Sequence, residues 1–194
     1  MTHILAHPPE SRQQDARVRR TREALRSALL ALLDEQPFEQ ITIRDISARA
    51  GAGYATFFRH YPDKAVLLSD LAADEIRELL ARALPILYAQ DTRAACLALC
   101  GYIDERRELW SVLLLGGASG TLREEFLRQA REAALAAPKD RPHSRLPNDL
   151  AVLFGVSGVL EIFKWWLEHG RDLSVTEVAD ILDRLVIAPI LKGR

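Results

Sequence analysis

Apolar residues in this chain recur at the 3.6-residue spacing of amphipathic helices, and no stretch shows the two-residue alternation of a half-buried strand. In the first long stretch, for example, Leu25, Leu29 and Leu32 fall on one face. The pattern, broken at prolines and glycines, predicts helices at about 15–36, 42–50, 53–60, 63–83, 91–104, 105–115, 120–136, 148–169 and 175–192. The sequence therefore predicts an all-α fold.

A helix-turn-helix pattern occupies residues 42–61. Thr42 and Asp45 have the spacing of a capping box at the start of a short helix, with Asp in place of the preferred Glu. Gly51 suits the left-handed turn at the end of that helix, and a second short helix is expected from about Gly53. The second helix of this motif is shaped to lie in the major groove of DNA. The pattern therefore predicts DNA binding.

Charge divides the chain into a basic front and an acidic rear. Residues 11–64 carry ten Lys or Arg and seven Asp or Glu, whereas residues 65–194 carry sixteen and nineteen. This distribution fits a DNA-binding head at residues 15–64 followed by a body at residues 65–194 that does not contact DNA. The arginines at the start of the first helix admit two interpretations, a solvated face or contacts to DNA phosphates. Residues 1–14 are expected to form a flexible arm.

The helix predicted at 148–169 is apolar around well over half of its circumference. A helix that covers one core needs an apolar stripe of only about 100°, so we expect one face inside the subunit and another against a second copy. The stripe of the last helix matches it, which predicts a two-fold, four-helix dimer interface. The expected interface residues are Val152, Gly155, Val159, Trp166, Val178, Ile181, Leu182 and Leu185. The alternative is a single large core without a dimer.

Residues 17–68 resemble the tetracycline-repressor (TetR) family of transcriptional regulators. The family's pattern is followed in order and spacing, over about a quarter of the chain, by Phe38-Glu39, Ile41 to Ile46, Ala50-Gly51, Thr56 to Tyr61, Lys64 and Leu67-Leu68. The rest of the chain agrees in architecture only. The resemblance implies a three-helix DNA-binding head and a divergent helical body that binds a small molecule and dimerises through its last two long helices. It further implies a repressor that leaves a palindromic operator when an effector binds.

The resemblance also implies which residues touch DNA. The positions that match the family's contacts to bases and phosphates are Thr42, Arg44, Gly53, Tyr54, Ala55, Thr56, Phe58, His60 and Lys64. For two of them a structural role is the alternative, because Thr42 can simply cap its helix and His60 can be a surface histidine. Two positions depart from the family: Phe58 lacks the hydroxyl of the usual Tyr, and Gly53 is a weaker helix cap than the usual Ser.

An effector pocket is expected among the helices at 91–169. The candidate lining residues are Tyr88, Cys96, Cys100, Tyr102, Trp110, Phe126, Phe154, Trp165 and Trp166. Each has plain core packing as its alternative, and Trp166 is equally a candidate anchor of the dimer interface. An aromatic-rich body favours a hydrophobic or aromatic effector.

Other functions find little support in the sequence. Cys96 and Cys100 lie one helical turn apart, which fits buried thiols or a redox sensor, and no histidine stands at metal-ligand spacing. Two near misses to the Gly-x-Ser-x-Gly motif follow no strand, and nucleotide-binding loops are missing, so we expect neither an enzyme nor a cofactor. Without a leader peptide or a membrane-spanning run, a cytoplasmic location is expected. The alternative function is a helical adaptor that binds proteins rather than DNA.

Overall fold

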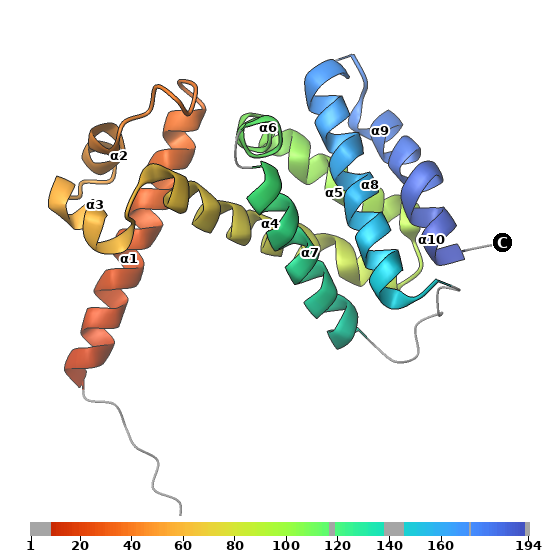
Figure 1. The fold of residues 1–194 in the computed structure, drawn as a ribbon, viewed down its shortest axis with the longest axis horizontal. Coiled ribbons are helices and arrows are strands. Elements are labelled where there is room, and N and C mark those ends of the chain that lie inside the picture. The colour runs from red at the N-terminus through yellow and green to blue at the C-terminus, as the bar shows by residue number, and fades with distance from the viewer. Residues whose placement is uncertain (1–8, 117–118, 138–145, 171, 193–194) are drawn as a thin grey trace, which may run out of the picture. The chain divides into compact units, whose positions relative to one another are not determined.

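In the computed structural model, every regular element of the described residues, 9–116, 119–137, 146–170 and 172–192, is a helix. The elements are α1 (Pro9–Leu33), α2 (Ile43–Arg49), α3 (Tyr54–His60), α4 (Lys64–Tyr88), α5 (Thr92–Glu105), α6 (Arg107–Leu115), α7 (Ser119–Ala136), α8 (Asn148–His169), α9 (Val175–Leu182), the π-helical turn η1 (Asp183–Ile187) and α10 (Ala188–Lys192) (Figure 1). The prediction of an all-α fold is confirmed.

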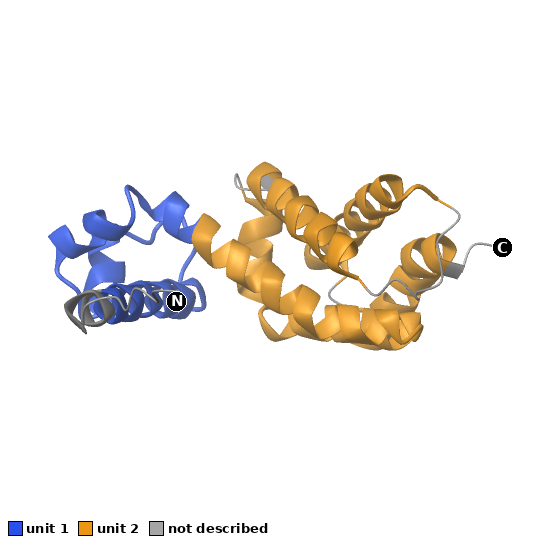
Figure 2. Ribbon diagram, turned by 90° about the horizontal axis from the view of Figure 1, so that it is seen from below, with its two compact units in different colours: residues 1–68 blue, residues 69–194 orange. Residues whose placement is uncertain are grey.

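The chain divides into two compact units, residues 1–68 and 69–194 (Figure 2). The first unit holds α1, α2, α3 and the first residues of α4, and the second unit holds the other helices. The helix-turn-helix pattern thus lies wholly within the first unit, and the helices expected to bind an effector lie in the second.

One apolar core holds the first unit together. Leu25 and Leu29 on α1, Ile46 on α2 and Phe57 on α3 keep no exposed surface. Burial of such a side chain stabilises the fold by about 1.5–3 kcal/mol. Helices as short as α2 and α3, with seven residues each, do not persist alone in water. Packing on α1 is therefore what fixes the helix-turn-helix geometry.

Two helices extend several residues beyond the ends predicted from the sequence, and proline explains both extensions. The first helix begins at Pro9, not near Asp15, because proline is well tolerated in a first turn, where its missing N–H has no partner to lose. Residues 1–8 of the predicted arm lie outside the described residues. The fourth helix continues through Pro85 to Tyr88 instead of ending before the proline. Pro85 lies on the exposed side of α4, where water can satisfy the freed carbonyl of Ala81.

The second unit is a bundle built around α8, which packs on α6, α7 and α9, while α5 packs on α9 (Figure 1). Its core contains Ile103 on α5, Trp110 on α6, Phe163 on α8 and Val178 on α9, none of which retains exposed surface. Four helices thus share one apolar interior, and this interior borders the cavity described below.

The last predicted helix, 175–192, is interrupted by the π-helical turn η1. The amide of Ala188 donates to the carbonyl of Asp183, one residue further back than in an α-helix. Pro189 accounts for the irregularity, because its ring crowds the carbonyl four residues earlier and it has no N–H to donate. The wider turn also brings Val186 against Gly158 of α8.

Candidate functional site

The start of α2 is closed by the predicted capping box. The amide of Asp45 donates to Thr42 Oγ1 at 3.2 Å, and the amide of Thr42 donates to Asp45 Oδ2 at 2.9 Å. The Thr42 hydroxyl also donates to Asp45 Oδ2, at 2.6 Å, and this bond, followed by the one from the Thr42 amide, holds the pKa of the Asp45 carboxyl below its ordinary value. Thr42 and Arg44 are both exposed, so the cap and a contact to DNA from the same position are compatible.

The turn between α2 and α3 depends on glycine. Gly51 has a φ of 62°, a left-handed conformation in which a side chain is strained. Gly53 caps α3 with extended backbone and offers no side-chain hydrogen bond. The structure therefore places Gly53 at the weak cap that the sequence predicted.

The outer face of α3 is aromatic. Tyr54 is 51% exposed and Phe58 is 46% exposed, and their rings meet edge to face at 5.2 Å between centroids. The guanidinium of Arg44 lies 5.9 Å from the centroid of the Tyr54 ring. Ala55 is exposed beside them. Rings left in solvent on a recognition helix are suited to apolar contact with thymine methyl groups.

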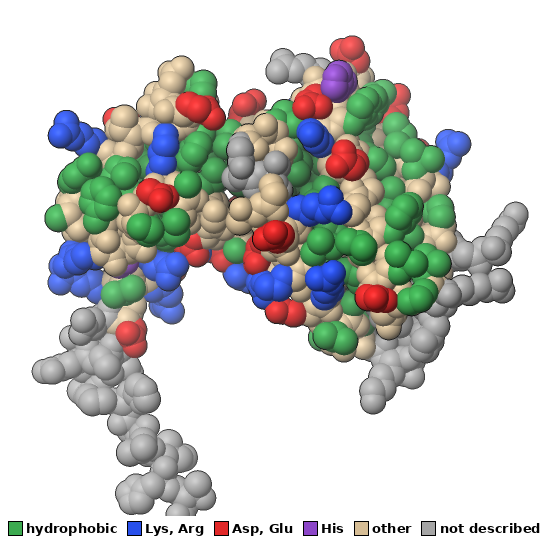
Figure 3. Space-filling view, viewed as in Figure 1, with side chains coloured by type: hydrophobic (Ala, Val, Ile, Leu, Met, Phe, Trp, Pro, Cys, Tyr) green, Lys and Arg blue, Asp and Glu red, His purple; other side chains and the backbone are tan. Residues whose placement is uncertain are grey.

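A basic groove of about 1010 Å³ runs between α1 and α3. It is lined by Arg17, Val18, Arg20, Thr21, Ala24, Ala50, Gly51, Ala52, Gly53, Thr56, Arg59 and His60. Arg59 Nη2 donates to Thr56 Oγ1 at 2.9 Å, which joins the two side chains into one polar group. Figure 3 shows Lys and Arg side chains gathered around α1 in this unit. The sequence reasoning missed Arg59, although its position next to His60 in the matched motif was available to point to it.

The surroundings of His60 disfavour its protonated form. Burial is the main factor that lowers its pKa, and the positive charges of Arg59 and Arg22 lower it further. A phosphate group brought into this groove would act in the opposite direction and favour the imidazolium. His60 thus lies in an environment that attracts anions.

Lys64 is placed differently from the other predicted DNA contacts. Its Nζ donates to the carbonyls of Phe38, Glu39 and Ile41 at 2.8, 3.2 and 2.8 Å, and it lies 4.6 Å from the centroid of the Phe38 ring. An ammonium group has three protons, so these three carbonyls use its full capacity. Lys64 in this structure pins the α1–α2 connection to the start of α4.

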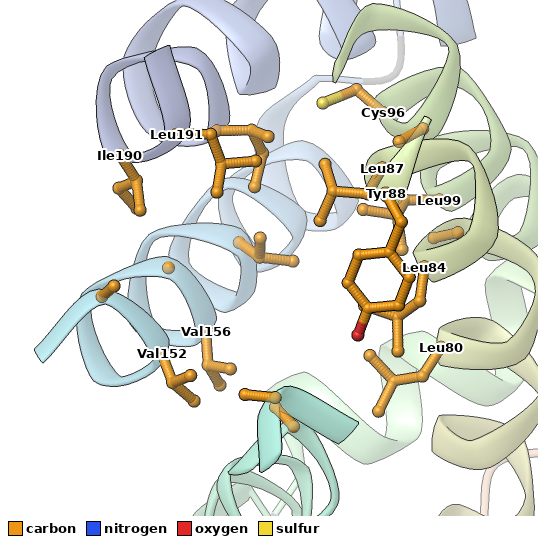
Figure 4. Close-up of a pocket in the computed structure, with 18 of the residues that line it drawn as sticks. Leu80, Leu84, Leu87, Tyr88, Cys96, Leu99, Val152, Val156, Ile190 and Leu191 are labelled. Atoms are coloured by element: carbon orange, nitrogen blue, oxygen red, sulfur yellow. The ribbon is translucent and has the colours of Figure 1, made fainter. Parts of the chain in front are cut away.

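The second unit contains an apolar cavity of about 180 Å³ (Figure 4). Five helices and η1 contribute to its wall, which consists of Leu80, Ala83, Leu84, Leu87, Tyr88, Ala95, Cys96, Leu99, Phe126, Ala130, Ala134, Asn148, Ala151, Val152, Gly155, Val156, Val159, Ile187, Ile190 and Leu191. The Tyr88 hydroxyl donates to the carbonyl of Ala133 at 3.2 Å. The wall therefore presents almost only hydrocarbon.

The structure sorts the predicted pocket residues into three groups. Tyr88, Cys96 and Phe126 line the cavity. Cys100, Tyr102, Trp110 and Trp166 are buried and do not line it, whereas Phe154 and Trp165 are 56% and 45% exposed. Most of the wall is aliphatic and comes from α4, α8 and the C-terminal helices. The aromatic residues of the sequence could not identify this wall, because a sequence does not distinguish aliphatic side chains that line a cavity from those of a core.

Tyr102 belongs to a buried polar cluster. Its hydroxyl donates to Glu75 Oε2 at 2.7 Å, and Arg106 lies 3.4 Å from the same carboxylate oxygen. The guanidiniums of Arg82 and Arg106 lie 4.6 and 4.5 Å from the centroid of the Tyr102 ring. Burial, followed by the hydrogen bond to Glu75, raises the pKa of the phenol. The cluster ties α4 to α5.

The predicted dimer residues are also divided. Trp166, Val178 and Leu182 are buried within the chain, and Val152, Gly155 and Val159 line the cavity. Leu185 is 65% exposed, and Ile181 is partly buried. The apolar residues of α8 that do face solvent are Leu150, Leu153, Phe154 and Trp165, and hydrophobic side chains cover much of this face in Figure 3.

By length and composition, α8 is apolar enough to cross a membrane, with a mean hydropathy of 1.6 over 18 residues. It is also the central helix of the second unit, packed on α6, α7 and α9. The hydropathy and the packing of α8 both agree with a helix that has one face in a protein core and a second apolar face exposed to solvent.

Neither the two cysteines nor a group of possible metal ligands forms a reactive site among the described residues. Burial raises the pKa of the Cys96 and Cys100 thiols to about 12, so neither is a thiolate at neutral pH. Within the described ranges, no group of three His, Cys, Asp or Glu side chains is placed to hold a metal ion.

Comparison with known proteins connects the first unit to a family. Residues 25–71 match the model of bacterial regulatory proteins, tetR family. The HTH-type transcriptional regulator YxbF of Bacillus subtilis (strain 168) is 40% identical over 72 residues, which are 37% of this chain and 19% of that protein. The chain thus spans about a fifth of the length of this curated relative.

Comparison with solved structures covers nearly the whole chain. A TetR transcriptional regulator from Streptococcus agalactiae 2603V is 22% identical with a TM-score of 0.61, over 91% of this chain and 98% of that one. RolR in complex with resorcinol is 16% identical with a TM-score of 0.59, over 90% and 89%. At these identities the likeness establishes the fold, a helix-turn-helix unit followed by a helical body.

Proposed function

We propose that this chain, a TetR-family transcriptional regulator, represses transcription as a homodimer on a palindromic DNA site and leaves that site when a small molecule fills the cavity of the second unit. The observation that carries the DNA-binding role is the first unit itself. Its helix-turn-helix places exposed aromatic and basic side chains on α3, beside a groove lined with arginine.

Within this proposal, the contacts to DNA divide by chemistry. Thr42, Arg44, Arg17 and Arg20 are suited to phosphate, which fixes the position of the head without reading sequence. The bases would be read from α3, by apolar contact from its exposed rings and by the guanidinium of Arg59. Lys64 would support these contacts from inside the unit.

Dimerisation would occur through the solvent-facing apolar residues of α8 together with Leu185 on η1. A two-fold pair of such faces is isologous, so each copy covers the other. Two heads can then enter successive major grooves if they lie about 34–36 Å apart. A palindromic site is the DNA counterpart of this symmetry.

Release by a small molecule would follow from a shift of population. A ligand that binds better to the dimer with the wrong head spacing lowers DNA affinity by its preference between the two states. The cavity lies partly on α4, the helix whose first residues belong to the DNA-binding unit. The structural neighbour RolR, in its complex with resorcinol, supports a small-molecule role for this cavity.

We further infer a cytoplasmic protein without catalytic activity, because regulators of this family act on DNA and typically lack enzyme activity. The alternative of a helical adaptor is not favoured, since it leaves the basic groove and the exposed recognition helix without a purpose.

Selection of bound fragments from genomic DNA tests the proposal. The expected result is a set of fragments that share a palindrome, bound by a dimer with an affinity that falls steeply with salt. Equal retention of all fragments, or of none, would contradict it. Light scattering on the free protein at micromolar concentration checks the dimer separately.

A further inference from the structure

We propose that the ligand of the cavity in the second unit is an uncharged, largely apolar molecule about the size of one substituted aromatic ring. The inference rests on the proposed effector role of this cavity and goes beyond it by naming the chemical class. It excludes metabolites that carry a carboxylate or a phosphate, and it excludes long acyl chains.

The size of the cavity sets the first limit. Its volume is about 180 Å³, and an apolar protein cavity of about 150 Å³ is known to hold benzene. A ring with one or two small substituents therefore fits the space. A twelve-carbon chain exceeds this volume and does not fit without displacement of side chains of the wall.

The wall sets the second limit, because none of the described residues that line it has a charged side chain. Its polar groups are the hydroxyl of Tyr88, the thiol of Cys96 and the side chain of Asn148, the last being exposed. An ionised carboxylate buried without a partner loses its hydration and gains nothing in return. One hydroxyl on a ligand is tolerable, since the phenol of Tyr88 lies within the wall (Figure 4).

The electrostatic surroundings of Cys96 in the wall are also unfavourable to anions. Next to burial, the largest factor that raises the pKa of Cys96 is the negative charge of Asp183 on η1. The basic side chain close by, Arg93, donates to Asp180 at 2.7 Å. A carboxylate placed beside Cys96 would meet the same repulsion as the thiolate does.

Calorimetric titration of the full-length protein tests the class directly, with toluene, phenol, benzoate and dodecanoate as probes at pH 7.5. We expect toluene and phenol to bind, and benzoate to bind at least tenfold more weakly than toluene. Benzoate or dodecanoate binding as tightly as toluene would overturn the proposal. Binding of none of the four would overturn it as well.

A cavity-filling variant locates the binding. Val156→Phe adds a ring to the α8 wall, where Val156 is 6% exposed, and it should abolish toluene binding with DNA affinity retained. Val175→Phe, at the start of α9 and away from the wall, is the matched control and should bind toluene normally. Unchanged toluene binding by Val156→Phe would refute the site.

A second variant and the absence of DNA from the titrations separate the possible failures. If Val156→Phe does not fold, Ala130→Leu fills the cavity from α7 instead, and the same loss is expected. The titrations use no DNA, so they stand even if no palindromic fragment is found. Conversely, a protein that binds a palindrome but none of the neutral probes would retain the proposed function and lose this inference.

Discussion

At the scale of the residue, the structure assigns different tasks to side chains that the family resemblance grouped together as DNA contacts. Tyr54, Ala55 and Phe58 lie exposed on α3, and Thr42 combines exposure with a cap. The ammonium of Lys64 is instead enclosed by three carbonyls. A sequence motif preserves a residue at a position without distinguishing a contact to DNA from a support for one.

Lys64→Met should therefore act on stability. The methionine keeps the aliphatic packing but leaves the carbonyls of Phe38, Glu39 and Ile41 without their donor, a loss of about 2 kcal/mol. Urea unfolding should show this decrease, while Lys164→Met on the exposed side of α8 should show none. The salt dependence of DNA binding should keep its slope. A slope reduced by about one would instead indicate that Lys64 contacts a phosphate.

Arg59→Ala should alter the choice of sequence. Arg59 is exposed on α3 and linked to Thr56, and an arginine that pairs with guanine contributes about 1–3 kcal/mol of discrimination. Competition between the selected DNA fragment and a scrambled one should show a larger loss for the selected fragment. Arg131→Ala, on the exposed side of α7, is the control. An equal loss on both fragments would reduce Arg59 to a phosphate contact.

DNA affinity should rise as the pH falls from about 7.5 to 6. The pKa of His60 in the free protein is depressed below 6.5, by burial first and then by Arg59 and Arg22. A neighbouring phosphate raises that pKa, so the complex takes up a proton that the free protein does not hold, and acid favours the complex. Fluorescence anisotropy across this range should show the trend, and His60→Gln should flatten it. His169→Gln, on the second unit, should leave it unchanged.

At the scale of the element, the pattern of apolar positions was sufficient to place every long helix, and it failed where a proline or a glycine acts through tertiary contacts. The continuation of α4 past Pro85 is favoured because Leu87 and Tyr88 gain a place in the cavity wall. The turn η1 follows from Pro189, but the contact that it brings about between Val186 and Gly158 of α8 lies outside any local window of the sequence. Likewise, the aliphatic cavity wall is invisible in a sequence whose core is also aliphatic.

Two glycines of α8 allow the close approach of this helix to be tested. A Cβ at Gly158 would lie 2.8 Å from Val186 Cγ2, and Val186 is 5% exposed with little room to move. A Cβ at Gly155 would meet Ile190 Cδ1 at 3.5 Å, an ordinary contact. Gly158→Ala should therefore destabilise the protein by about 1–3 kcal/mol through overpacking. The higher helix propensity of alanine should offset part of this loss.

Gly155→Ala should instead stabilise the protein by up to about 1 kcal/mol, because only the gain in helix propensity applies. Thermal unfolding of the two variants beside the unmodified chain measures the contrast. If both alanines shifted the unfolding temperature equally, α8 and η1 would be further apart than the structure places them.

At the scale of the whole molecule, the solvent-facing apolar residues of α8 are the basis of the proposed dimer. Phe154 and Trp165 are about half exposed on the helix that forms the centre of the second unit. Exposed apolar surface of this kind is characteristic of an interface. The proposed palindrome recognition needs such an interface, because one head alone reads only half of a two-fold site.

A charge placed in that face should separate the copies without unfolding them. Phe154→Glu puts a carboxylate at a position that is 56% exposed in one copy, so the isolated fold loses little, whereas a dimer would have to bury the charge without a partner. Light scattering should report a monomer, circular dichroism should report unchanged helix content, and affinity for the palindromic fragment should fall by more than tenfold.

Leu135→Glu is the matched control, because Leu135 is a more exposed apolar residue, at 87%, and it belongs to α7 instead of α8. It should leave the dimer and its DNA affinity intact. A Phe154→Glu variant that remained dimeric would move the interface to another surface of the second unit. A monomer that still bound the palindrome at full affinity would show that the two heads bind DNA independently, and it would remove the basis for release through their spacing.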